Sequence, residues 1–228
     1  AAAWKGSASP KSFNNEIGVP LTLLAARPDD RYVVVEIGMN RPGEILALAS
    51  IAKPTVAVVT MVGRVHLEGL GSLAAIAREK SSLLESLEAS GLAVVNASSE
   101  ILLDAIARRR VRASRVRRFG TAATSSCDAA LVGRRVSGTG QAIEVRDAAG
   151  KVATFELALP GEHNAMNALA AVIVGRELGL GDDQIRAGLS SVKPAGMRLE
   201  PVDIGEITIF NDESMDLVTG GGNGAATG

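Results

Sequence analysis

The sequence predicts an α/β protein in which a mostly parallel sheet is flanked by helices and carries a small antiparallel β insert. Apolar, β-branched runs at residues 31–40, 54–60 and 91–97 end in turns and alternate with helical patterns. Strands buried on both faces of a parallel sheet are typically continuous apolar runs of this kind. Between residues 116 and 159 the pattern changes to short alternating segments separated by Gly and Asp turns, which is typical of an antiparallel meander.

Composition and charge narrow the class of protein. The 228 residues suffice for one large domain or two small ones, and the core should be aliphatic because 46% of residues are hydrophobic and only 3% aromatic. The net charge of -1 gives no reason to expect nucleic acid or an anionic membrane as partner. With one cysteine, no apolar leader and no run of about 18 apolar residues, we expect a cytoplasmic protein that does not enter a membrane.

Residues 1–12 are mostly small or polar and show no periodic pattern, so we expect a disordered end or a junction between segments there. Asn14 and Asn15 fit a turn, and Pro20 is a favourable first residue for the helix that follows. On the residues alone, this stretch is interpreted as the start of a helix.

The strand predicted at residues 31–40 carries Glu36 in its last turn, beside Gly38. A carboxylate at the end of an apolar strand is costly unless it is paired or binds a cation. We therefore expect a metal ion or a lysine beside Glu36. A short helix is predicted next, at residues 43–52.

Residues 54–80 predict a strand, a glycine-containing loop and a helix with two reactive side chains. The strand ends at a loop that carries His66, and a helix that begins near Ser72 brings Lys80 back toward the end of the strand. In open α/β sheets ligands bind outside the carboxyl ends of parallel strands, so we expect chemistry at this loop. An ordinary loop histidine and a surface lysine remain open as alternatives.

A helix predicted at residues 101–110 runs into a segment with seven arginines between Arg108 and Arg118. This segment could bind phosphate or nucleic acid. It also lies where a helix ends and a strand begins, and basic residues near a helix C-terminus are favoured by the helix dipole. We favour a solvated face over a nucleic-acid site.

The C-terminal part predicts helices at residues 161–180 and 182–192, the second with Asp182 as N-cap. A turn and two strands follow up to Asp212. The last residues, 217–228, are rich in glycine, but no Lys-Ser or Lys-Thr follows the glycines, so we expect a disordered tail and not a phosphate-binding loop.

The chain contains four segments in this order: FNNEIGVPLTLL, VVEIGMNRPGEI, VGRVHLEGLGS with IAREK, and LPGEHNAMNALAA. Together they resemble the Mur ligase family, the ATP-dependent ligases of peptidoglycan precursor synthesis. The similarity covers about residues 12–216, and FNNEIGVP points to the branch that adds D-alanyl-D-alanine to UDP-MurNAc-tripeptide. The resemblance implies that residues 13–216 form the family's central ATPase domain, whose complete enzyme we expect to be a monomer.

Three positions correspond to the family's metal site. Glu36 and His66 match its magnesium ligands, and Lys80 matches a lysine that many members carbamoylate to provide a carboxylate for a second magnesium ion. The residue types suit the ion, because Mg2+ prefers hard oxygen ligands, keeps several waters and is commonly shared with substrate phosphates.

Six further positions correspond to residues that hold ATP and the substrate. Asn164 and Asn167 resemble residues near adenine, and Arg198 and Asp212 resemble those around the ribose and phosphates. Asn14 and Asn15 would lie toward the UDP-sugar peptide. Without the resemblance, Asn164 would be interpreted as a cap for a helix that begins at Ala165.

The sequence also departs from the family pattern. The glycine-rich loop ending in Lys-Thr, which precedes FNNEIGVP in the family and holds the ATP phosphates, is absent from the 228 residues, as are the flanking N- and C-terminal domains. Met61 stands where the family usually has Asn, and Tyr-Asn-Ala-Asn-Pro is missing after Asp212. We therefore expect the chain alone to be inactive, and a non-catalytic Mg2+- or nucleotide-binding module is the alternative.

Overall fold

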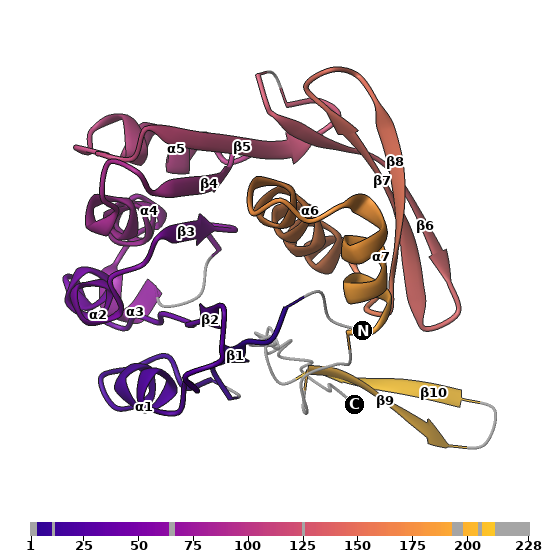
Figure 1. Ribbon diagram of the computed structural model, residues 1–228, viewed down its shortest axis with the longest axis horizontal. Coiled ribbons are helices and arrows are strands. Elements are labelled where there is room, and N and C mark those ends of the chain that lie inside the picture. Colours follow the sequence, from indigo (N-terminus) through magenta and orange to yellow (C-terminus); the bar gives the residue numbers. More distant parts are fainter. Residues whose placement is uncertain are drawn as a thin grey trace, which may run out of the picture. The chain divides into compact units, whose positions relative to one another are not determined.

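The structure, a computed structural model, describes residues 4–10, 12–63, 67–124, 126–192, 198–204 and 207–212 (Figure 1). The chain divides into two compact units, Ala1–Lys193 and Pro194–Gly228. In the described part of the second unit, β9 (Arg198–Ile204) and β10 (Ile207–Asp212) form an antiparallel hairpin, which confirms the two predicted strands. The predicted tail at residues 217–228 lies outside the described residues.

A six-stranded mixed sheet forms the centre of the first unit. Neighbouring strands are parallel from β3 to β6 and antiparallel from β6 to β8. In sheet order the strands are β3 (Val56–Val59), β4 (Leu92–Asn96), β5 (Arg115–Thr121), β6 (Ala129–Ser137), β7 (Gly140–Asp147) and β8 (Val152–Leu157).

The antiparallel part differs from the predicted insert at residues 116–159. β5 belongs to the parallel part, and β6 runs in the same direction beside its end, with Phe119 opposite Ala129. Within the six-stranded sheet, the antiparallel pairs are β6 with β7 and β7 with β8, and these strands extend the main sheet. Alternation in sequence predicts that a segment is a strand, but it does not say in which direction that strand pairs.

Helices cover both faces of the parallel strands (Figure 1). Alternate residues of β4 pack into two different cores, Leu92 and Val94 into one and Ala93 and Val95 into the other. This explains why the strand is apolar throughout. The first core includes residues of α6 (Glu162–Glu177) and α7 (Asp182–Ser190). The second core includes residues of the 3-10 helix η1 (Leu83–Ser86) and of α5 (Glu100–Ala107). A further helix, α4 (Leu73–Ser82), packs against α5.

The N-terminal segment forms a separate two-stranded sheet. β1 (Ser7–Ala8) pairs in parallel with β2 (Val33–Val34), whereas we expected residues 1–12 to be disordered and residues 31–40 to join the main sheet. Two helices flank these strands in sequence, α1 (Gly18–Leu24) and α2 (Glu44–Ala52). A short helix, α3 (Leu67–Leu70), precedes α4.

Helix starts are set by local hydrogen bonds that only partly match the predictions. The Ser72 hydroxyl accepts from the Ala75 amide and caps α4, as a helix start near Ser72 requires. α7 is preceded by Gly181, so Asp182 is its first residue and not its N-cap. The Asp182 carboxylate instead pairs with both Nε and Nη2 of Arg176, at 2.8 and 2.9 Å. No helix in the described part of the chain is long and apolar enough to span a membrane.

Candidate functional site

Lys80 reaches the carboxyl end of β3, as the chain order predicts. Its Nζ donates to the carbonyl oxygen of Met61 at 2.8 Å, two residues after the last residue of β3. The cap at Ser72 fixes where α4 begins, and Lys80 lies about two turns along that helix. Burial lowers the pKa of the Lys80 ammonium, because the charged form loses solvation there.

Asn96, at the end of β4, supports the same edge and was not singled out from the sequence. Its Nδ2 donates to the carbonyl oxygen of Thr60 at 2.7 Å, and its Oδ1 accepts from the amide of Ser98 at 2.9 Å. The Ser98 hydroxyl lies 2.8 Å from that of Thr124 and accepts from the amide of Thr121. The ends of three parallel strands are thus joined by short polar side chains. The sequence signal that could have identified this residue is a single asparagine at the end of the apolar run that forms β4.

Glu36 lies beside Asn14 and not beside a lysine. Asn14 Nδ2 donates to Glu36 Oε1 at 2.9 Å, and the backbone amide of Glu36 donates to the Ser9 hydroxyl at 2.9 Å. The Asn14 carbonyl in turn accepts from the amide of Gly38 at 2.7 Å. The expected lysine partner is therefore wrong for the described residues, while a metal partner stays a prediction.

Asn15 has a different role from its neighbour. Its Oδ1 accepts from the backbone amides of Ile17 and Gly18, at 3.1 and 2.9 Å. These bonds satisfy donors at the start of α1, which begins at Gly18 and not at Pro20. The residue is exposed to solvent.

A second carboxylate that the sequence did not reveal lies next to Lys80 in the chain. Glu79 is only 7% exposed, and its two oxygens accept from the backbone amides of Gly43 and Ile45, at 2.9 and 3.0 Å. The carboxylate therefore faces the positive end of α2, where negative charge is favoured. This contact ties α4 to the start of α2.

The residues expected near the nucleotide lie in two units. Asn164 is inside the first turn of α6, and its Nδ2 donates to the carbonyl oxygen of Pro160 at 2.7 Å. Because α6 begins at Glu162, Asn164 does not cap a helix starting at Ala165. Asn167 is exposed on the same helix.

Arg198 and Asp212 are opposite each other in the register of the β9–β10 hairpin, which belongs to the second unit. His66 lies outside the described residues. Within the described ranges no three His, Cys, Asp or Glu side chains gather into a metal-binding group. The predicted set of Glu36, His66 and Lys80 includes a residue outside the described ranges, so it stays a prediction.

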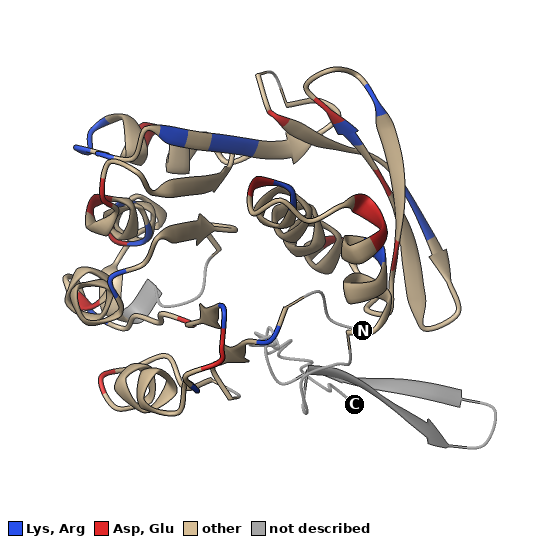
Figure 2. Cartoon of the chain, in the orientation of Figure 1, with Lys and Arg blue, Asp and Glu red and all other residues tan. Residues whose placement is uncertain are grey.

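Most of the arginine-rich segment is paired with carboxylates of the chain itself. Basic residues lie along β5 (Figure 2), where the guanidinium groups of Arg115 and Arg117 pair with Glu177 at 3.5 and 2.6 Å. Arg109 pairs with Glu85 at 2.9 Å and also contacts the Ser81 hydroxyl. This pairing favours a structural role over a nucleic-acid site.

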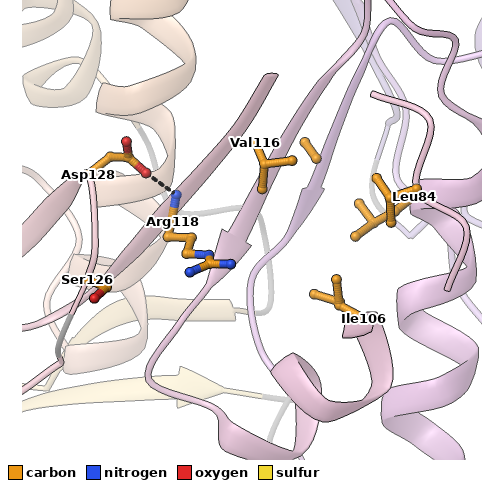
Figure 3. Close-up of a pocket in the computed structure, with 8 residues that line it drawn as sticks. Leu84, Ile106, Val116, Arg118, Ser126 and Asp128 are labelled. Atoms are coloured by element: carbon orange, nitrogen blue, oxygen red, sulfur yellow. Dashed lines mark hydrogen bonds between the residues drawn. The ribbon is translucent and has the colours of Figure 1, made fainter. Parts of the chain in front are cut away.

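A hollow of about 370 Å³ opens beside β5, between that strand and α5 (Figure 3). Apolar side chains line one part of it, and Arg118, Ser126 and Asp128 line the other. The backbone amide of Arg118 donates to Asp128 Oδ2 at 2.7 Å. Glu36, Lys80, Asn164 and Asn167 do not line this hollow, so it is separate from the contact between Lys80 and Met61.

Comparison with known proteins decides the family. A family model described as the Mur ligase middle domain matches residues 2–175, which is more than half of the chain. The chain belongs to the Mur ligase family. Its fold agrees, because the structure of MurF from Acinetobacter baumannii superposes with a TM-score of 0.80 at 26% identity, covering 92% of this chain and 45% of that one.

Relatives of this Mur ligase chain are named UDP-N-acetylmuramoyl-tripeptide–D-alanyl-D-alanine ligase. The Escherichia coli K12 protein is 36% identical over 92% of this chain, and the Bacillus subtilis 168 protein is 34% identical over 88%. A solved MurF from Thermotoga maritima, in complex with ADP, has a TM-score of 0.76 at 25% identity, covering 91% of this chain and 47% of that one. The chain spans less than half the length of these relatives, 45% of the E. coli protein and 42% of the B. subtilis protein.

Proposed function

We propose that this chain is the central domain of an ATP-dependent ligase that joins D-alanyl-D-alanine to UDP-MurNAc-tripeptide. The names of its relatives supply the reaction, and the ADP complex of a relative supports a nucleotide as cosubstrate. The observation within the chain that carries the proposal is Lys80 held at the carboxyl end of β3 with a lowered pKa. The complete enzyme acts in the cytoplasm as a monomer in this proposal.

The residues present fit a magnesium ion. Glu36 keeps one carboxylate oxygen that takes no hydrogen bond from the described residues, and carboxylate oxygen is the ligand type that Mg2+ prefers. Glu36, His66 and Lys80 would hold the metal in this proposal. When bound, Mg2+ offsets negative charge on the ATP phosphates and on the substrate carboxylate.

Lys80 is suited to carbamoylation. The ammonium group first loses one proton. The neutral amine then attacks carbon dioxide, forms an N–C bond as one C=O π bond opens, and releases a second proton, so the cationic side chain becomes an anionic carbamate. The lowered pKa favours the neutral amine that this step needs. An ammonium group in this position would repel the metal, whereas a carbamate provides oxygen ligands.

The remaining residues would bind the nucleotide and the acceptor. Asn164 and Asn167 lie one helical turn apart on α6, and we assign them to adenine, with Arg198 and Asp212 at the ribose and phosphates. Asn15 is exposed and would face the sugar peptide, while its Oδ1 accepts from the amide of Gly18 at the start of α1.

A chimera tests the proposal. The matching region of the E. coli relative is replaced by this chain, and phosphate release that depends on D-alanyl-D-alanine is measured. We expect Lys80→Arg to lower kcat by about 100-fold, since arginine keeps the charge but cannot form a carbamate. Lys80→Glu should recover part of the rate, and Lys53→Arg is the matched control.

An active chimera whose Lys80→Arg variant is equally fast would refute the carbamate role. A folded but inactive chimera would favour a non-catalytic binding module.

A further inference from the structure

Two residues expected at different parts of the site are joined by one hydrogen bond. Asn14 was assigned to the sugar peptide and Glu36 to the metal, yet Asn14 Nδ2 donates to Glu36 Oε1 at 2.9 Å across 22 positions of sequence. Both side chains are half-buried. One oxygen of the carboxylate is therefore fixed, and the other takes no hydrogen bond from the described part of the chain.

The backbone holds both partners in place. The Asn14 carbonyl accepts from the Gly38 amide at 2.7 Å, and the Glu36 amide donates to the Ser9 hydroxyl at 2.9 Å. A Cβ atom at Gly38 would lie 2.7 Å from Cγ of Asn14, so the amide group rests directly against this glycine. The contact is thus built from three segments and does not depend on one flexible side chain.

We propose that Asn14 is a positioning residue for Glu36, whose carboxylate it orients so that the second oxygen is available to a divalent cation. The inference rests on the proposed function, in which Glu36 is a magnesium ligand. A neutral amide suits this task, because it fixes the carboxylate without adding a positive charge that would compete with the metal. Partners of metal ligands commonly set ligand orientation, and their loss weakens metal binding by about 10- to 100-fold.

Manganese binding to the 228-residue chain tests the proposal. Mn2+ replaces Mg2+ as a spectroscopic probe, and the free ion is counted by electron paramagnetic resonance. We expect Asn14→Leu to raise the Kd for Mn2+ by about 10-fold, and Glu36→Gln to raise it at least as much. The matched control is Asn40→Leu, the same change at an exposed asparagine outside the proposed site, which should leave the Kd for Mn2+ unchanged.

A second measurement needs no metal. In the chain labelled with 13C and 15N, the side-chain amide signal of Asn14 is assigned by through-bond correlation with its own backbone amide. Glu36→Gln should shift this signal and leave that of Asn15 in place, because Asn14 donates to the carboxylate whereas Asn15 accepts from backbone amides of its own segment. Titration of the parent with Mg2+ should then shift the Asn14 signal as well. Since Glu36→Gln leaves Asn14 in the chain, this readout remains valid if Asn14→Leu does not fold.

The outcomes separate the two proposals. A parent chain that binds Mn2+, loses it in Glu36→Gln and keeps its full affinity in Asn14→Leu would overturn the positioning role alone. A parent that binds no Mn2+, or binds it equally well after Glu36→Gln, would overturn the metal role of Glu36 and the inference with it. An Asn14 signal that Glu36→Gln leaves unchanged would overturn the inference without reference to any metal.

Discussion

The buried carboxylate of Glu79 lies at the start of α2, where its two oxygens accept hydrogen bonds from the backbone amides of Gly43 and Ile45. Glu79→Ala would leave those amides without partners in a site that water reaches poorly. We expect the variant to lose about 2–3 kcal/mol of unfolding free energy, measured by urea denaturation. Exposed Glu88, 3.7 Å from Arg112, is the control, and Glu88→Ala should cost less than about 0.5 kcal/mol. Equal losses in the two variants would contradict this account of Glu79.

Lys80 gives a prediction about pH. Burial lowers the pKa of Lys80 in the folded chain below its value in the unfolded chain. Burying the charged amine therefore costs folding free energy at low pH. That cost decreases as pH rises through the folded pKa toward the unfolded pKa, so the stability of the chain increases over this range. The neutral amine is accordingly present at lower pH in the folded chain than in the unfolded one. With 13C-bicarbonate at about pH 8, we expect a carbamate signal in the 13C spectrum of the folded chain. The signal should be lost in Lys80→Arg and kept in Lys151→Arg, and its loss on unfolding would confirm the dependence on burial.

At the scale of elements, Glu177 joins the last turn of α6 to β5 through two arginines. The Arg117 pair is short, and Glu177 is only partly exposed, so the ion pair is less screened than one at the surface. We expect Arg117→Ala to lower the unfolding free energy by about 1 kcal/mol, with exposed Arg108→Ala as the matched control. An equally small effect of both substitutions in chemical denaturation would show that the arginine-rich segment is simply a solvated face.

The sequence predicts most helices and strands of this fold, but it predicts fewer of the pairings between strands. β3, β4, α4 and α5 were predicted because apolar runs and a serine cap are local signals. The separate pairing of β1 with β2 and the parallel pairing of β5 with β6 depend on contacts between distant segments, which periodicity does not encode.

The candidate site shows the same division between local and distant information. Lys80 could be placed at the end of β3 by counting residues along one strand, loop and helix. Two contacts could not be predicted, that of Asn14 with Glu36 and that of Glu79 with the start of α2. Each contact joins residues more than 20 positions apart. A polar residue within or next to an apolar segment signals that some partner exists, but the sequence alone does not identify that partner.

At the scale of the whole molecule, the 228-residue polypeptide should not turn over ATP by itself. Its sequence contains no glycine-rich loop ending in Lys-Ser or Lys-Thr, the usual source of backbone amides and a lysine for the β and γ phosphates. We expect no ADP formation above background with ATP, Mg2+ and both substrates, whereas weak nucleotide binding through α6 can persist. Calorimetry with ADP on the parent and on Asn164→Ala measures that binding, with exposed Glu162→Ala as the control on the same helix turn. Ligase turnover by the isolated chain at the rate of the E. coli relative would show that phosphate binding is supplied by residues other than such a loop.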